Sequence, residues 1–215
     1  MLKTRTYKKR VGGYTIIETM VSVSVFLVVV VSGMGAFLNA NLLHEKTQDM
    51  RSITDSLSFI MEDISRSLRT GFQYRCIATG NPVTPINLPT VGPQSCASGY
   101  AIVFKPEDYP ANGSAQWAYK FEANAQSNGL MAIWKTTNAQ AASPTWVVLN
   151  PEEVIIDSFS GFPGFSVLGA ESSSASPSNQ QQPFVTIRIS GRIIFKNTST
   201  PFYLQTSVSQ RAIDP

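Results

Sequence analysis

One uninterrupted apolar stretch near the N-terminus constrains this chain more than any other feature of its sequence. From Tyr14 to Leu38 the sequence reads YTIIETMVSVSVFLVVVVSGMGAFL, and its one charged residue is Glu18. As an α-helix, these 25 residues are long enough to cross a hydrocarbon core about 30 Å thick. A buried strand is much shorter than this. The stretch therefore predicts a membrane-spanning helix.

The charge on the two sides of this stretch predicts its orientation. Residues 1–13 contain no acid and five basic residues, namely Lys3, Arg5, Lys8, Lys9 and Arg10. The rest of the 215-residue chain has 12 basic against 14 acidic residues, although the whole chain has a formal net charge of +3. The positive-inside rule places the N-terminus in the cytoplasm and the bulk of the chain outside. Because nucleic-acid-binding domains are usually basic throughout, nucleic acid is a disfavoured but open partner.

Two simpler interpretations of the apolar stretch compete with a functional membrane helix. A secretory signal peptide has an apolar region of about 7–15 residues, followed by small residues at the cleavage site. This stretch is longer, and Leu38-Asn39-Ala40 matches such a site poorly. A plain signal anchor fits the length but does not explain the acid. An intramembrane carboxylate is costly unless it is paired, so Glu18 is a candidate functional residue.

The residues at the start of the stretch resemble a known processing site. Gly12-Gly13-Tyr14-Thr15-Ile16-Ile17-Glu18 follows a short basic leader, and together these features resemble the prepilin cleavage and methylation site of type IV pilins and type II secretion pseudopilins. The resemblance covers about 25 residues. It departs from the family pattern only mildly at Tyr14, where the family usually has Phe.

The resemblance implies how the chain is processed and assembled. A prepilin peptidase would cut after Gly13 and methylate the new N-terminal amine of Tyr14. Glu18, at the fifth mature position, would be required for assembly into a filament from the inner membrane by an assembly platform and its ATPase. The length and the Met61–Ser67 stretch MEDISRS resemble the minor J- or W-type subunits. The new amine of Tyr14 and the carboxylate of Glu18 lie four residues apart on one helix face. A neighbouring subunit that is shifted along the filament is therefore able to bring its own amine to this carboxylate, and the pairing would set the register between subunits.

The helix is predicted to continue beyond the membrane to about residue 70. Residues 39–70 carry an apolar stripe at three- and four-residue steps, typical of an amphipathic helix docked on a globular head. The stripe consists of Leu42, Leu43, Met50, Ile53, Leu57, Ile60, Met61, Ile64 and Leu68. Gly71 is placed to cap the helix. A free coiled coil is the alternative.

Residues 71–99 are predicted to form a loop closed by the two cysteines. The segment between Cys76 and Cys96 contains four prolines and two glycines. An oxidising compartment favours a disulfide here, whereas two unpaired thiols remain the alternative.

Residues 100–215 are predicted to form an antiparallel β-sheet head, and the whole chain an α+β fold that resembles the pilin plan. Apolar side chains alternate with others in three places, around 115–135, 185–195 and 202–208. Asn128-Gly129 predicts a hairpin loop, Asn197–Pro201 a turn, and residues 170–183 a flexible exposed loop.

Other candidate chemistry is sparse, and no cofactor, metal or catalytic constellation is predicted. The lone His44 excludes His-rich metal sites. The acidic pairs Glu107-Asp108 and Glu152-Glu153 lack the spacing of a calcium loop, so calcium is only an alternative. Arg188, Arg192 and Lys196 share one face of a strand and offer either phosphate contacts or a solvated sheet face. The three tryptophans, Trp117, Trp134 and Trp146, offer either a ligand platform or, for the first two, core packing.

The sequence therefore predicts a non-enzymatic, structural filament subunit, anchored by one inner-membrane helix before assembly. Its expected partners are other pilin or pseudopilin subunits, the prepilin peptidase, membrane lipid and the assembly machinery. The alternative is a signal-anchored extracytoplasmic ligand-binding or adhesion protein that does not polymerise.

Overall fold

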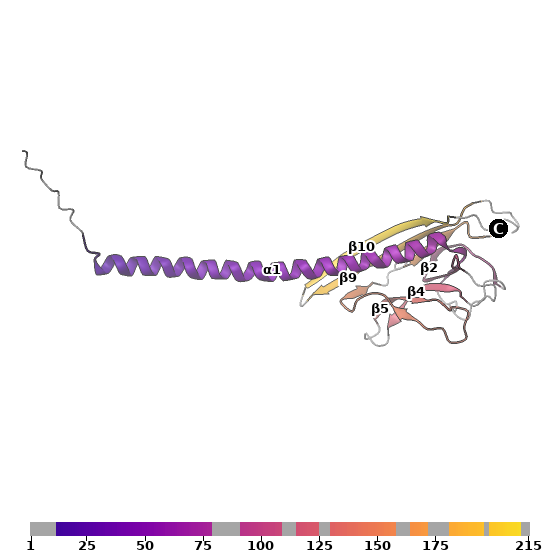
Figure 1. The fold of residues 1–215 in the computed structure, drawn as a ribbon, viewed down its shortest axis with the longest axis horizontal. Coiled ribbons are helices and arrows are strands. Elements are labelled where there is room, and N and C mark those ends of the chain that lie inside the picture. The colour runs from indigo at the N-terminus through magenta and orange to yellow at the C-terminus, as the bar shows by residue number, and fades with distance from the viewer. Residues whose placement is uncertain are drawn as a thin grey trace, which may run out of the picture. The chain divides into compact units, whose positions relative to one another are not determined.

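The computed structural model describes residues 12–78, 91–108, 115–124, 130–157, 164–171, 181–195 and 198–211. They form one long helix, α1 (Ile16–Thr70), followed by strands that build one antiparallel sheet (Figure 1). The strands are β1 (Phe72–Ile77), β2 (Cys96–Gly99), β3 (Ala101–Lys105), β4 (Trp117–Asn124), β5 (Leu130–Thr136), β6 (Val147–Val148), β7 (Val154–Ile156), β8 (Gly164–Leu168), β9 (Phe184–Phe195) and β10 (Thr198–Ser209). The predicted combination of an apolar N-terminal helix and a large antiparallel sheet is confirmed.

The chain divides into two compact units, Met1–Gln48 and Asp49–Pro215, and α1 contributes to both. In the first unit the helix is exposed on all sides. In the second unit, which we call the head, the remaining turns of α1 bury one face against the sheet. The buried residues of α1 are Ile53, Leu57, Ile60, Met61, Ile64 and Leu68. All six belong to the predicted apolar stripe, whereas Leu42 and Leu43 of that stripe are exposed, so only the later part of the stripe docks on the sheet.

The core of the head lies between α1 and one face of the sheet. Alternate residues of the strands point into it, including Phe104, Tyr119, Phe121, Phe165 and Ile187, which are almost fully buried. Rings pack against each other within this layer, with the centroids of Phe121 and Phe165 5.1 Å apart. Because the core draws on both helix and sheet, neither can bury its apolar face alone.

The strands are joined in the order β1-β3-β4-β5-β7-β9-β8-β2. Two short strands, β7 and β8, pair with different parts of the long strand β9. Strand β10 lies on the other side of β9 and pairs with it over its whole length. Gly191 in β9 allows β7 to approach closely, since a Cβ atom at this position would lie 2.3 Å from the carbonyl oxygen of Ile155 in β7.

The C-terminal end of α1 is held by hydrogen bonds to the residues that follow it and to the last described residues of the chain. The backbone N–H of Gly71 donates to Ser67 O at 3.1 Å, and the backbone N–H of Arg211 donates to Arg69 O at 2.9 Å. The buried Tyr74 hydroxyl contacts Leu68 O and lies 2.7 Å from Gly71 O. Carbonyls at a helix C-terminus lack intrahelical partners, and here the following strand and the chain's last described residues supply donors.

Two predicted loops differ from the structure. Residues 71–99 begin and end in strands, since β1 and β2 lie within this segment; its Pro/Gly-rich middle is largely outside the described residues. The predicted turn at 197–201 is too long, because β10 begins at Thr198 and Pro201 pairs with Arg192 inside the strand. Proline is tolerated there because β10 has a described neighbour on one side only. Asn128-Gly129 and most of the predicted 170–183 loop lie outside the described residues.

Candidate functional site

The predicted cleavage junction lies just before the helix. Gly12, Gly13 and Tyr14 are exposed and precede the first helical residue, Ile16. A Cβ atom at either glycine would have no other atom within 4 Å. The rest of the predicted basic leader, residues 1–11, lies outside the described residues. Within those residues, nothing shields the Gly13–Tyr14 bond from a peptidase.

Thr15 and Glu18 define the start of α1. The backbone N–H of Glu18 donates to Thr15 Oγ1 at 3.3 Å, which is the geometry of an N-cap threonine. Thr-x-x-Glu is the capping-box pattern, and an acid in the first turn also complements the helix dipole. Glu18 therefore has a local reason to occupy this position. Its carboxylate is exposed and has no ion-pair partner among the residues that the structure describes.

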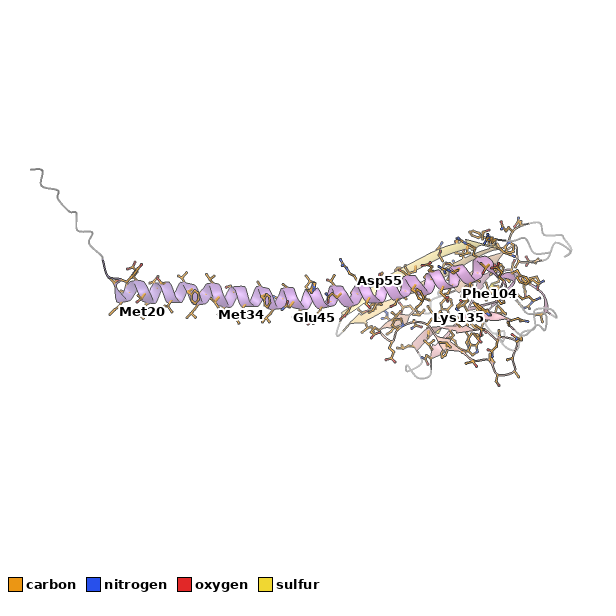
Figure 2. The ribbon with its side chains drawn as sticks, in the orientation of Figure 1. Met20, Met34, Glu45, Asp55, Phe104 and Lys135 are labelled. Atoms are coloured by element: carbon orange, nitrogen blue, oxygen red, sulfur yellow. A yellow bond between two sulfur atoms is a disulfide. The ribbon has the colours of Figure 1, made fainter. Side chains whose placement is uncertain are left out.

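The apolar stretch is fully exposed along the first unit of the chain. Figure 2 shows the side chains around Met20 and Met34 projecting outward from the helix. The helix α1 is long and apolar enough to cross a membrane, and none of the residues in its most apolar part is buried. Burial inside this protein therefore does not explain the apolar stretch.

Polar side chains inside the stretch bond to the helix backbone. Thr19 Oγ1 donates to Ile16 O, Ser22 Oγ donates to Glu18 O and Ser24 Oγ donates to Val21 O, each at 2.8 Å. Such bonds satisfy hydroxyl groups that would otherwise be costly in a hydrocarbon environment. These three hydroxyl groups are thus compatible with a membrane span, whereas Glu18 carries a charge.

Cys76 in β1 and Cys96 in β2 form a disulfide, with their Cα atoms 5.7 Å apart. The backbone N–H of Cys76 donates to Gln94 O at 2.9 Å and ties the same two segments together. Gly99 is required beside the disulfide, because a Cβ atom there would lie 2.5 Å from Cys76 Sγ. The cross-link fixes the ends of the Pro/Gly-rich segment to the core.

We expect a non-reducing peptide map of the exported protein to show Cys76 and Cys96 joined. Closing a loop of this size contributes about 3 kcal/mol in the chain-entropy model. Reduction should accelerate hydrogen exchange in residues 71–99 more than in α1, because the disulfide joins only β1 to β2. Two free thiols in the exported protein would contradict the pairing.

A partly buried ion pair, missed by sequence reasoning, connects α1 to the sheet. Lys135 Nζ in β5 lies 2.8 Å from Asp63 Oδ2 in α1. The Tyr119 hydroxyl in β4 lies 3.1 Å from both Asp63 Oδ2 and Ser67 Oγ. Burial raises the pKa of Tyr119, so its hydroxyl stays neutral. The only sequence signal for this contact was the spacing of Asp63 and Ser67, which lie four residues apart on α1 beside the apolar stripe. Their partners, Tyr119 in β4 and Lys135 in β5, became apparent only once the sheet was placed against α1.

A pocket of about 480 Å³ opens beside this ion pair. It lies between the last turns of α1 and the sheet, and includes Lys135, labelled in Figure 2. Its lining residues are Asp63, Arg66, Ser67, Thr70, Pro106, Glu107, Asp108, Ala115, Trp117 and Lys135. Pockets of 300–1,000 Å³ are large enough for small ligands, but such sites are mostly apolar, whereas half of these residues are charged.

The remaining candidate residues do not assemble into a site among the described residues. No group of three or more His, Cys, Asp or Glu side chains there is placed to hold a metal ion. His44 Nε2 contacts Gln48 Nε2 at 3.0 Å along α1. Glu107 and Asp108 line the pocket just described, whereas Glu152 belongs to the lining of a second pocket and Glu153 is exposed.

The basic row on β9 is partly committed to contacts within the head. Arg192 Nη2 lies 3.0 Å from Asp157 Oδ1, and Arg188 Nη2 donates to Ala97 O at 3.5 Å. Lys196 lies outside the described residues. Arg192 is exposed and Arg188 is half-buried, so the two described members of the row differ in their access to solvent.

The three tryptophans are half-buried and do not form one platform. Trp117 packs on the main core near Phe104, whereas Trp146 packs on a second, smaller cluster. Lys120 Nζ lies 4.2 Å from the ring centroid of Trp146 and 5.9 Å from that of Trp134. Trp117 therefore packs on the core, as predicted. The same prediction for Trp134 is wrong, since Trp134 belongs to neither core cluster and flanks Lys120 together with Trp146.

Comparison with known proteins adds no relative: no family model, no curated protein and no solved structure matches this chain.

Proposed function

We propose that this chain is a structural, non-enzymatic subunit of a type IV pilus-like filament. One observation carries the proposal: a fully exposed apolar helix begins directly after an accessible Gly12-Gly13 pair and carries a carboxylate, Glu18, in its first turn. An exposed helix of this kind needs an apolar environment, which lipid supplies before assembly and neighbouring helices supply in a filament. Minor-subunit identity rests on the weaker J- or W-type resemblance.

In this proposal, the prepilin peptidase cuts after Gly13 at the cytoplasmic face of the inner membrane. The head stands outside, where the Cys76–Cys96 disulfide is stable. An assembly platform and its ATPase then transfer the chain from lipid into the filament. The filament is extracellular for a pilus and periplasmic for a pseudopilus.

We expect N-terminal mass spectrometry of the membrane-derived protein to find a mature chain that begins at Tyr14 with a methylated amine. Gly13→Val should block cutting. The resemblance to prepilins implies that the peptidase requires a small residue at this position, and valine has a branched side chain. Gly12→Ala is the matched control, since it adds a single methyl group next to the site. An N-terminus at residue 1, or a cut near Ala40, would rule out this processing.

The polar pocket favours a second candidate function, that of a signal-anchored extracytoplasmic protein that binds a ligand through its head. The charged and aromatic lining beside Lys135 and Trp117 supports it. Processing separates the two candidates, because a plain anchor retains residues 1–13 and does not enter sheared filaments.

A further inference from the structure

The order of the sheet returns to its starting strand. Strand β1 is first in this order and β2 is last, yet the Cys76–Cys96 disulfide joins the two. Backbone bonds run beside it, since the N–H of Cys76 donates to Gln94 O at 2.9 Å and the N–H of Gln94 donates to Tyr74 O at 3.0 Å. On its other side, β2 pairs with β8. Residues 94–99, which we call the strap, therefore connect β1 to β8.

The pairing of the strap with β8 is short and irregular. Strand β2 has four residues, and its register with β8 is interrupted between the pairs Cys96–Val167 and Gly99–Phe165. By contrast, all five residues of β8 pair with β9 in continuous register. Short pairings are marginal in water unless other contacts support them. Pairing alone is therefore a weak attachment of the strap to β8.

The strap covers buried apolar side chains of β8. Phe165 and Val167 are fully buried, and in the pairing register they lie opposite Gly99 and Cys96 of the strap. Residues 97–98 of the strap are themselves exposed. Loss of the strap would open the edge of β8 to solvent and expose part of both side chains, which is unfavourable for apolar groups.

The strap has polar side-chain attachments and a covalent one. Ser95 donates from its backbone N–H and its hydroxyl to the two carboxylate oxygens of Glu171, at 2.8 and 2.7 Å. Arg188 Nη2 adds a longer bond to Ala97 O, at 3.5 Å. These bonds are exposed, so water competes for both partners and the net contribution of each is small. The disulfide, whose Cys76 is buried, is therefore the main attachment of the strap.

We infer that the strap is a redox-sensitive closure of the sheet. With the disulfide formed, the strap caps the edge of β8; with the disulfide reduced, the strap detaches while β8 stays paired with β9. Reduction by an added dithiol breaks the S–S bond, yields the thiols of Cys76 and Cys96, and oxidises the dithiol to its own disulfide. That closure occurs only after export rests on the proposed function, whereas the opening on reduction does not.

Hydrogen exchange tests this closure in the purified full chain in detergent. Exchange is measured by mass spectrometry before and after dithiothreitol is added to the folded, oxidised protein, so a failure to fold cannot obscure the result. We expect reduction to accelerate exchange about tenfold or more in both residues 96–99 and residues 164–168. Strand β4 is the internal reference, because it pairs with β3 and β5, and its exchange should change less than about twofold.

Glu171→Gln in the oxidised protein is the matched control. It removes the charge of the polar attachment and keeps one carbonyl oxygen for Ser95, so exchange in residues 96–99 should rise less than about threefold. A rise as large as that caused by reduction would show that Glu171, and not the disulfide, holds the strap.

Three further results would overturn the inference. Acceleration in residues 71–99 without residues 164–168 would show that the strap does not cap β8. Equal acceleration in β4 would show that the disulfide stabilises the whole head, and no acceleration in residues 96–99 would show that the strap stays closed without it. The measurement requires neither cleavage nor assembly, so its failure is distinguishable from a failure of the proposed filament function.

Discussion

Replacement of Glu18 by Gln is expected to reduce incorporation into filaments by about an order of magnitude or more, while the head folds and oxidises normally. In the proposed filament, the carboxylate meets the N-terminal amine of a neighbouring Tyr14 in apolar surroundings. Gln removes the charge and nearly preserves the shape, so the amine loses its counter-ion. Cleavage after Gly13 should continue.

The structure makes this substitution a clean test of charge. Glu18 also occupies the third helical position of a capping box, where Gln serves as well as Glu. A loss of assembly in Glu18→Gln therefore does not come from a lost helix cap. The control is Asp55→Asn, which neutralises an exposed acid of α1 within the head. Its incorporation should match that of the unsubstituted chain.

The decisive measurement is the ratio of this protein in sheared filaments to that in the membrane fraction. Unchanged incorporation of Glu18→Gln would show that the carboxylate does not set the register in this subunit. That outcome has a physical meaning of its own, because a subunit at the filament tip has no neighbour ahead of it whose amine needs this acid.

Replacement of Ile64 by Ala is expected to destabilise the head by about 2–5 kcal/mol, the range for deleting a large buried aliphatic side chain. Ile64 is fully buried on the face of α1 that packs against the sheet. The truncation leaves a cavity between helix and sheet that the rigid sheet cannot close. The free energy of unfolding of the detergent-solubilised chain measures the effect.

Phe59→Ala is the matched control on the same helix. Phe59 is 73% exposed, so its truncation removes a large side chain without opening a cavity. Its free energy of unfolding should change by less than about 0.5 kcal/mol, as for most surface substitutions. Equal effects of the two substitutions would mean that α1 is not docked through the Ile64 face.

Sequence pattern alone determined the elements whose side chains repeat over many residues. The apolar stripe from Ile53 to Leu68 appears in the structure as the buried face of α1, because a 3.6-residue period is visible without knowing the partner. Alternation likewise located β4, β5, β9 and β10. The Gly12-Gly13 junction, Tyr14 and Glu18 are also local in sequence, so their pattern is readable directly, whereas their roles in processing and assembly remain proposals.

Only the tertiary structure decided the features that join distant segments. Strands β1, β2 and β3 were missed because β1 and β2 flank a Pro/Gly-rich segment and β3 is buried along its whole length, which removes the alternation. Strands β6, β7 and β8 were also missed, because two to five residues are too few to show a period. The Asp63–Lys135 ion pair spans a sequence separation of 72, and no periodicity marks such a pair. That β10 has a described neighbour on one side only is likewise invisible in sequence, because the same alternation occurs in an interior strand. Whether a strand has one neighbour or two is set by the order of pairing, which depends on how the entire sheet packs against α1.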